Sequence, residues 1–332
     1  MRIGLVDVDG HNFPNIALMK LSAWHKRRGD TVEFADPAAR RYDKVYMSKV
    51  FTFSRDCTDR YDCEVVRAGT GYRDYATILP EEIEHICPDY SLYGVKEAYG
   101  FLTRGCVNRC SWCVVPHKEG EVRAHADIEE FLDGRKRAVL LDNNVLASEW
   151  GLMQIEKIVR MGIRVDFNQG LDARRIARTP EIAALLARVK WIRFLRMAYD
   201  SRAMQDDVHK AIELLRKHGV PARRLFFYVL IRDDTEDALG RIRELKALGC
   251  QPFAQPYRDF EHEGKPSWEQ WRPTGAIANR CSTPWIMRNT EKNELNNRTY
   301  EQTENQICRR VRLSCSNGGR AYRIAIYRLP CL

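Results

Sequence analysis

Three cysteines within eight residues are the part of this sequence best suited to chemistry. Cys106, Cys110 and Cys113 follow the spacing C-x3-C-x2-C. Three thiolates placed so closely can bind three irons of a [4Fe–4S] cluster and leave the fourth iron without a protein ligand. A small molecule can bind and react at such an open iron, so the spacing predicts a reactive iron–sulfur site.

The same cysteines have two other interpretations. A structural zinc ion would need a fourth ligand, which His117 could supply. Disulfides are the second alternative, but the chain has 11 cysteines, an odd number, and Met1-Arg2-Ile3-Gly4 leads into an apolar stretch rather than a secretory leader. We therefore expect a reducing, cytoplasmic compartment, where cysteine clusters usually bind metals.

The residues around the cysteines carry a resemblance to a known family. The cysteines follow a short apolar segment at 99–102, and Trp112 directly precedes Cys113. This resembles the signature of the radical S-adenosylmethionine superfamily, C-x3-C-x-aromatic-C in the loop after the first barrel strand, over roughly residues 95–258. The resemblance implies that S-adenosylmethionine binds the open iron. An electron donor such as flavodoxin or ferredoxin then drives its cleavage to a 5′-deoxyadenosyl radical, and Trp112 shields the cluster.

The elements that must position this loop alternate between strand and helix. Strands are predicted at residues 99–102, 137–142, 163–167, 191–199, 225–231 and 251–255, with helices at 126–133, 149–161, 180–188, 204–218 and 235–248. Residues 138–141 and 226–231 are continuously apolar, which is typical of strands buried on both faces. The family's frame is a partial (β/α)6 barrel of the TIM type, so the resemblance implies that fold for residues 96–258.

Polar residues follow several of these strands, where the functional groups of such barrels gather. Asp142-Asn143-Asn144 follows the second strand, and Asp166-Phe167-Asn168-Gln169-Gly170 ends the third. The resemblance implies that groups after the second strand contact the amino group of the cofactor, although the common Gly-Gly-Glu is absent here. Tyr199 and Tyr228 could equally be core aromatics. The predicted cofactor-binding residues are Trp112, Asp142, Asn143, Gln169, Arg174, Tyr199 and Tyr228.

Residues 1–95 are predicted to form a smaller, doubly wound, Rossmann-like α/β domain. A strand at 3–6, an amphipathic helix at 15–28 and strands at 31–34, 44–47 and 64–66 imply parallel pairing. The run Asp9-Gly10-His11-Asn12-Phe13-Pro14 resembles the Asp-x-His-x-x-Gly motif of cobalamin-binding domains, with Pro14 in place of the glycine. We expect the cobalamin-binding-like fold, with cobalamin binding itself as the lesser alternative and a turn or cap role for His11 as the other.

The remaining cysteines leave a second cluster open. The loop Cys113-Val114-Val115-Pro116 resembles the radical methylthiotransferases, which carry three further cysteines in an N-terminal domain. Cys57, Cys63 and Cys87 match that number but not the local spacing, so ordinary free thiols are the alternative. Residues 259–332 are predicted to be an irregular extension with a β-hairpin around Asn317-Gly318. Its cysteines, Cys281, Cys308, Cys315 and Cys331, show no tight spacing.

Composition limits the partners without naming one. The formal net charge of +9 is compatible with RNA or with a solvated basic surface. No apolar run reaches the ~20 residues of a membrane span. The sequence therefore predicts a radical S-adenosylmethionine enzyme whose substrate is a small molecule, a peptide or RNA. The alternatives are a methylthiotransferase-like or other RNA-modifying enzyme and a non-catalytic iron–sulfur or zinc scaffold.

Overall fold

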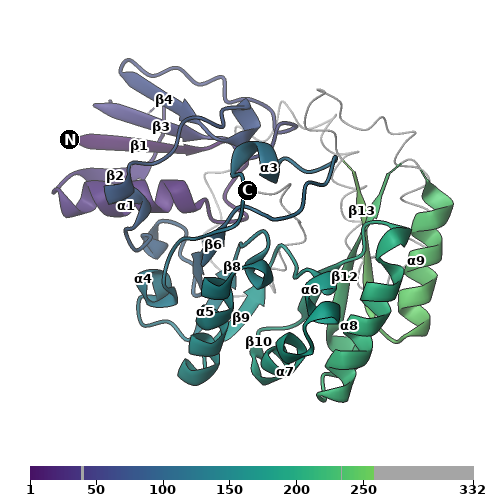
Figure 1. Ribbon diagram of the computed structural model, residues 1–332. Helices are drawn as coiled ribbons and strands as arrows, with labels where there is room; N and C mark the ends of the chain where they lie inside the picture. Colours follow the sequence, from purple (N-terminus) through teal and green to yellow (C-terminus); the bar gives the residue numbers. More distant parts are fainter. Residues whose placement is uncertain (39–40, 233, 258–332) are drawn as a thin grey trace, which may run out of the picture.

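The chain folds as a mixed α/β protein built on parallel sheets, as predicted. The computed structural model describes residues 1–38, 41–232 and 234–257. The first sheet has the order β2-β1-β3-β4, and all of its neighbouring strands are parallel. Its strands are β1 (Arg2–Asp7), β2 (Thr31–Phe34), β3 (Lys44–Ser48) and β4 (Glu64–Ala68). Figure 1 shows this sheet at one end of the molecule, with helix α1 (Ile16–Arg27) against it.

The remaining parallel strands form two further sheets. One has the order β10-β9-β8-β5 and the other the order β11-β12-β13. Leu171 pairs with Met197 as an isolated parallel bridge, and its amide donates to the Arg196 carbonyl at 2.7 Å. The two sheets are therefore joined between β9 and β11. The strands are β5 (Ala98–Gly100), β8 (Arg137–Leu140), β9 (Arg164–Phe167), β10 (Lys190–Trp191), β11 (Leu195–Ala198), β12 (Leu225–Ile231) and β13 (Gln251–Pro256).

The helices between these strands begin at side chains that cap them. Ser148 accepts from the Gly151 amide at the start of α5, and Asp234 accepts from the Asp237 amide at the start of α9. The main helices are α4 (Ile128–Leu132), α5 (Glu149–Met161), α6 (Ala173–Arg178), α7 (Pro180–Arg188), α8 (Gln205–Lys217) and α9 (Thr235–Ala247). The sequence predicted all of these except α6, which is capped by Asp172.

Short elements near the cysteines were not predicted. Strands β6 (Thr103–Arg104) and β7 (Arg123–Ala124) pair antiparallel, and α3 (Val115–Lys118) follows Cys113. Helix α2 (Glu81–Glu84) lies earlier in the chain. The 3₁₀ turns are Thr70–Tyr72, Tyr90–Leu92, Val145–Ala147, Arg202–Met204 and Ala222–Arg224. The β6–β7 pair holds the two ends of the segment that contains the cysteines next to each other.

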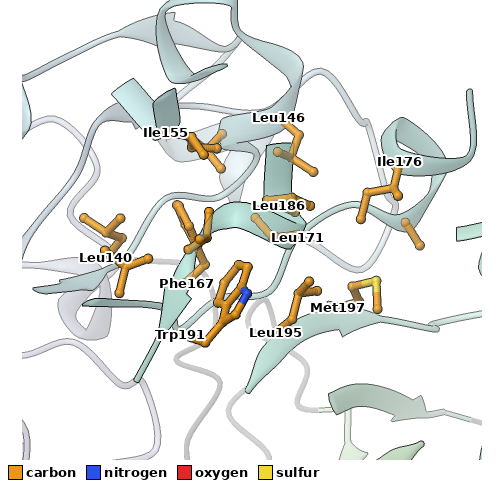
Figure 2. Close-up of a cluster of buried hydrophobic side chains, with 14 of the residues drawn as sticks. Leu140, Leu146, Ile155, Phe167, Leu171, Ile176, Leu186, Trp191, Leu195 and Met197 are labelled. Carbon is orange, nitrogen blue, oxygen red and sulfur yellow. The ribbon is translucent and has the colours of Figure 1, made fainter. Parts of the chain in front are cut away.

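The larger core lies between the strands and their covering helices. Figure 2 shows Phe167 and Trp191 side by side, with ring centroids 6.0 Å apart. Leu140 and Ile155 lie around them and have no exposed surface. Fully burying an aliphatic side chain stabilises a fold by about 1.5–3 kcal/mol, so this layer fixes the positions of the strand ends.

Helix α1 belongs to two cores at once. Met19 is fully buried in the larger core, while Leu18 and Leu21 pack with Ile3 and Leu5 in a smaller one. The helix begins at Asn15, whose side chain accepts from the Leu18 amide. The first sheet is therefore attached to the rest of the molecule through apolar packing.

Two findings concern the predictions about membrane spans and about residues 259–332. No helix among the described residues is both long and apolar enough to cross a bilayer. The predicted extension at 259–332, its hairpin and its four cysteines lie outside the described residues.

Candidate functional site

A buried carboxylate fixes the start of the cysteine loop, which we define as residues 105–114. The side chain of Glu119, at the end of α3, is only 3% exposed. Its two oxygens accept from the Gly105 amide at 2.9 Å, from Arg104 Nη2 at 2.7 Å and from Asn143 Nδ2 at 3.0 Å. The Cys106 amide also donates to the Gly120 carbonyl at 3.1 Å. The loop thus leaves and re-enters the fold at one anchored point.

A second carboxylate joins the middle of the loop to the ends of β8 and β9. Asp172 Oδ2 accepts from Asn108 Nδ2 at 2.8 Å and from Asn144 Nδ2 at 3.3 Å. Arg174 binds the same carboxylate through Nε at 2.8 Å and Nη2 at 2.9 Å. Burial by itself would raise the pKa of Asp172, but the hydrogen bonds and charge of Arg174 hold it below its usual value. Asp172 is therefore an ionised anchor.

The thiols lie against these polar groups. Cys106 Sγ accepts from the Asn108 amide and from Asn144 Nδ2, both at 3.4 Å. Burial raises the pKa of the Cys110 thiol, and the neighbouring Arg174 guanidinium acts in the opposite direction. Arg174 also interacts electrostatically with Cys106. The first two cysteines therefore share one cation, and Cys106 also accepts from two N–H donors.

The tip of the loop reaches the far strands. Arg232, just after β12, lies over the Trp112 ring with its guanidinium carbon 4.9 Å from the ring centroid. The same carbon lies 5.9 Å from the Tyr257 ring centroid, just after β13. Trp112 is thus linked through Arg232 to the ends of β12 and β13, and its role as a shield stays a prediction.

Buried polar atoms without partners gather after β8 and β9. Among the described residues, Asp142 Oδ2, Asn144 Oδ1, Asn168 Nδ2 and both polar atoms of Gln169 make no hydrogen bond. All four side chains belong to residues at most 3% exposed. An unsatisfied buried polar group costs about 1–3 kcal/mol, so native proteins rarely keep several together. The set contains both donors and acceptors, as a ligand with amino and carboxylate groups needs.

Asp142 and Asn143 hold the frame of this site. Asp142 Oδ1 accepts from the Leu102 amide at 3.0 Å, the Thr103 amide at 2.6 Å and Thr103 Oγ1 at 2.7 Å. Burial raises the pKa of Asp142 to about 6 despite these bonds. Asn143 donates to Glu119, as described above. Both residues therefore order the chain on either side of the cysteine loop, with Oδ2 of Asp142 left over.

The two predicted tyrosines lie in different places. Tyr228 donates to the Asn168 carbonyl at 2.8 Å and accepts from Arg196 Nη1 at 3.1 Å. It is thus adjacent to the unpartnered groups. Tyr199 instead donates to Glu244 Oε2 on α9 at 3.3 Å, so the structure does not bring its hydroxyl to the cysteine loop.

The donor set fits an iron–sulfur cluster. In the part of the chain that the structure describes, no three His, Cys, Asp or Glu side chains converge as a preformed metal site. The three thiols nevertheless lie on one short loop, each partly exposed and none in a disulfide. Thiolates are the usual ligands of such clusters, and the anchors at Glu119 and Asp172 hold the loop beside the buried, unpartnered polar atoms.

A large cavity lies between the ends of the first sheet and the segment that anchors the cysteine loop. This cavity of about 1020 Å³ is lined by residues that include Asp7 and Asp9, at and after the end of β1, and Arg104 and Lys118 near the cysteine loop. The His11 ring stacks on Phe34 with centroids 3.8 Å apart. Burial lowers the pKa of His11. Cobalamin binding and a second cluster at Cys57, Cys63 and Cys87 both stay predictions.

Sequence reasoning did not assign Asn144, Asn168, Asp172 or Glu119 a role in the site. The first three were visible as polar residues at strand ends, but nothing in the chain showed which of them would be buried without partners. One usable signal was that Asp142 and Asn144 lie two residues apart, because such side chains face the same side of an extended chain. Glu119 had no such signal, because its partners come from residues 104 and 105 and from the distant residue 143.

No protein-family model matches the chain, and no curated protein matches it. The family resemblance of the cysteine motif therefore rests on the residues themselves.

Proposed function

We propose that this protein is a radical S-adenosylmethionine enzyme. Cys106, Cys110 and Cys113 would hold a [4Fe–4S] cluster, and S-adenosylmethionine would bind beside it. When reduced, the cluster supplies the electron that cleaves S-adenosylmethionine to methionine and a 5′-deoxyadenosyl radical, which abstracts a hydrogen atom from the substrate. The observation that carries the proposal is the group of buried polar atoms without partners on Asn144, Asn168 and Gln169, of which Asn144 also contacts Cys106 of the anchored three-cysteine loop.

The chain's own residues have separable roles in this proposal. Gln169 and Asn168, after β9, offer buried donors and acceptors to the amino-acid part of the cofactor. Arg174 supplies positive charge beside Cys106 and Cys110, which offsets the charge of a thiolate cluster. Trp112, held by Arg232, covers the loop and excludes water.

The fold we propose for residues 96–258 is a partial (β/α)6 barrel. Its support is the chain order of the parallel strands, β5-β8-β9 and then β11-β12-β13, joined through Leu171 and Met197. In such a frame all carboxyl ends meet at one mouth. The cysteine loop touches groups after β8, β9 and β12, which is the arrangement that a common mouth requires.

Anaerobic reconstitution tests the proposal. We expect about four irons per chain and, on reduction with S-adenosylmethionine present, formation of 5′-deoxyadenosine. Cys110→Ala should lose both, while Cys63→Ala should keep both. A wild-type chain that binds only zinc and never forms 5′-deoxyadenosine would overturn the proposal in favour of a zinc scaffold. About eight irons, lost partly in Cys63→Ala, would add the second cluster.

The substrate class is a separate experiment. RNA modification is favoured by the net charge of +9 and the methylthiotransferase-like loop. Binding of tRNA should then weaken steeply with salt, because each neutralised phosphate releases counterions. Salt-independent or absent binding would favour a small metabolite or peptide. Product analysis of the reduced enzyme with S-adenosylmethionine and cell extract would identify it.

A further inference from the structure

One amide side chain contacts both a predicted cluster ligand and the carboxylate that anchors the loop. Asn144 Nδ2 lies 3.4 Å from Cys106 Sγ and 3.3 Å from Asp172 Oδ2. An amide nitrogen carries two hydrogens, so each acceptor can receive one. Asn144 is 2% exposed, so both contacts are shielded from bulk water.

The orientation of this amide is dictated by its neighbours. An ionised carboxylate only accepts hydrogen bonds, and a thiolate does the same. Reversing the amide would place Oδ1 of Asn144 against both acceptors, Asp172 and Cys106. Asp172 is held ionised by Arg174, so it keeps the NH₂ group directed at the sulfur.

The backbone that carries Asn144 is also fixed. Asn144 directly precedes the 3₁₀ turn Val145–Ala147, and its carbonyl accepts from the Ala147 amide at 3.1 Å. The turn packs against Gly151 of α5 so closely that a Cβ there would lie 2.2 Å from the Val145 carbonyl oxygen. The donor is therefore held in place before any cluster binds.

We propose that Asn144 is a positioning residue that tunes the iron–sulfur cluster through its N–H···S bond to Cys106, with Asp172 setting the direction of that bond. This rests on the proposed function. In that function an external one-electron donor is oxidised and the cluster gains its electron, so negative charge on the sulfurs grows. A hydrogen bond to a cluster sulfur stabilises the reduced state more than the oxidised one. Asn144 therefore eases reduction.

The test compares reduction potentials of reconstituted full-length protein in an electron paramagnetic resonance titration. Asn144→Leu keeps the volume and removes the donor, so its cluster should be harder to reduce, by up to about tenfold in the reduction equilibrium, or ~59 mV for one electron. Gln154→Leu is the matched control. It also replaces a buried amide by leucine, but Gln154 bonds to Asp127 and to the Ile128 amide rather than to the cysteine loop, so its potential should equal that of the wild type.

Each outcome decides something. Equal iron content with an unchanged potential in Asn144→Leu would overturn the inference and leave the proposed function standing. A wild-type chain that builds no [4Fe–4S] cluster would overturn both. If Asn144→Leu binds no cluster, the wild type is compared with the smaller Asn144→Ala instead. The wild-type Fe–S stretching frequencies should then shift between H₂O and D₂O and those of Asn144→Ala should shift less, whereas equal shifts would overturn the inference.

Discussion

At the scale of single residues, three aspartates near the ends of β8 and β9 have three different jobs. Asp142 binds main-chain and side-chain donors of residues 102 and 103, Asp166 forms a buried ion pair with Arg196, and Asp172 joins the cysteine loop to Arg174. The same residue type thus supports the main chain, forms an ion pair and anchors a loop. The environment of each determines how its ionisation affects stability.

Asp142 should make the folded protein more stable at acidic than at neutral pH. Its pKa is raised by burial to about 6 in the folded state, from 3.8. The folded protein therefore binds more protons than the unfolded chain between these values, and this stabilising contribution is lost as the pH rises through about 6. Relative to Asp142→Asn, the wild type should lose roughly 2 kcal/mol of unfolding free energy between about pH 4 and pH 7, at 1.36 kcal/mol per pKa unit. Urea denaturation at both values measures this.

Asp172→Asn provides the opposite sign as a control. The pKa of Asp172 is lowered in the folded state, so its contribution is present above the unfolded pKa and is lost as the pH falls. The wild type should gain on Asp172→Asn as the pH rises. The same direction of change in both variants would contradict the assignment of Asp142 as a carboxylate that is easier to protonate when folded.

The buried ion pair should be far more sensitive than an exposed one. Arg196 binds Asp166 through two contacts of 2.6 and 2.8 Å, with side chains 9% and 11% exposed. Arg196→Met leaves a buried carboxylate without its partner, which typically costs about 3–5 kcal/mol. Arg178→Met is the matched control, because Arg178 is 70% exposed in its 3.3 Å pair with Asp207. Its loss should stay below about 1 kcal/mol. Similar losses in chemical denaturation would refute the contrast.

At the scale of elements, two glycines flank the cysteine segment and differ in the space around them. Gly105 has φ +79° and Gly120 φ +70°, so a side chain strains the backbone at both. A Cβ on Gly105 would lie 2.1 Å from the Glu121 carbonyl oxygen, whereas nothing lies within 4 Å of one on Gly120. The β6–β7 pair explains the difference, since it brings residue 105 next to residue 121.

Gly105→Ala should therefore damage the loop, and Gly120→Ala should not. We expect Gly120→Ala to cost roughly 1–2 kcal/mol from the left-handed conformation alone. Gly105→Ala must also move backbone and should lose the Glu119 contact and iron binding. Thermal unfolding and iron content after reconstitution measure the two effects. Full iron loading in Gly105→Ala would show that the Glu119 anchor is dispensable.

Elements whose bounds the local sequence alone determines were predictable. Helices at 149–161 and 180–188 and the strand at 225–231 have the predicted bounds, because apolar periodicity and caps specify them locally. The single strand predicted at 191–199 is two, β10 and β11, because residues 190–191 pair with β9 while residues 195–198 pair with β12. The pattern of apolar residues does not show which neighbouring strand a given strand pairs with. Helix α6 was missed because its six residues are too few to show an apolar periodicity.

At the scale of the whole molecule, the site depends on contacts that no local pattern encodes. The cysteine spacing led to the proposed chemistry, and the order of the strands predicted polar groups at their ends. That Asn108, Asn144 and Arg174 share one carboxylate depends on how three separate loops meet. Long-range contacts of this kind follow from packing. The sequence therefore indicated which polar residues follow the strands, but not which of them contact one another.

Unfolding of the described part should be cooperative, because α1 joins its two cores. Met19 is fully buried in the larger core while its neighbours on the helix fill the smaller one. Met19→Ala should cost about 2–5 kcal/mol and weaken both cores in one transition. Met153→Ala, on the 59% exposed Met153 of α5, should change stability by less than about 0.5 kcal/mol. Denaturation followed by near- and far-ultraviolet circular dichroism would test this, and two separated transitions in Met19→Ala would contradict it.

The anchor at Asp172 has a consequence for the timing of assembly. It binds Asn108 across 64 residues of chain. At a synthesis rate of about 5–20 residues per second, the ribosome makes the carboxylate ~3–13 s after the cysteines. During that interval the three thiols exist without the contacts that orient them. The final shape of the loop is therefore reached only when much later parts of the chain have emerged, and the newborn cysteines depend on the surrounding redox conditions until then.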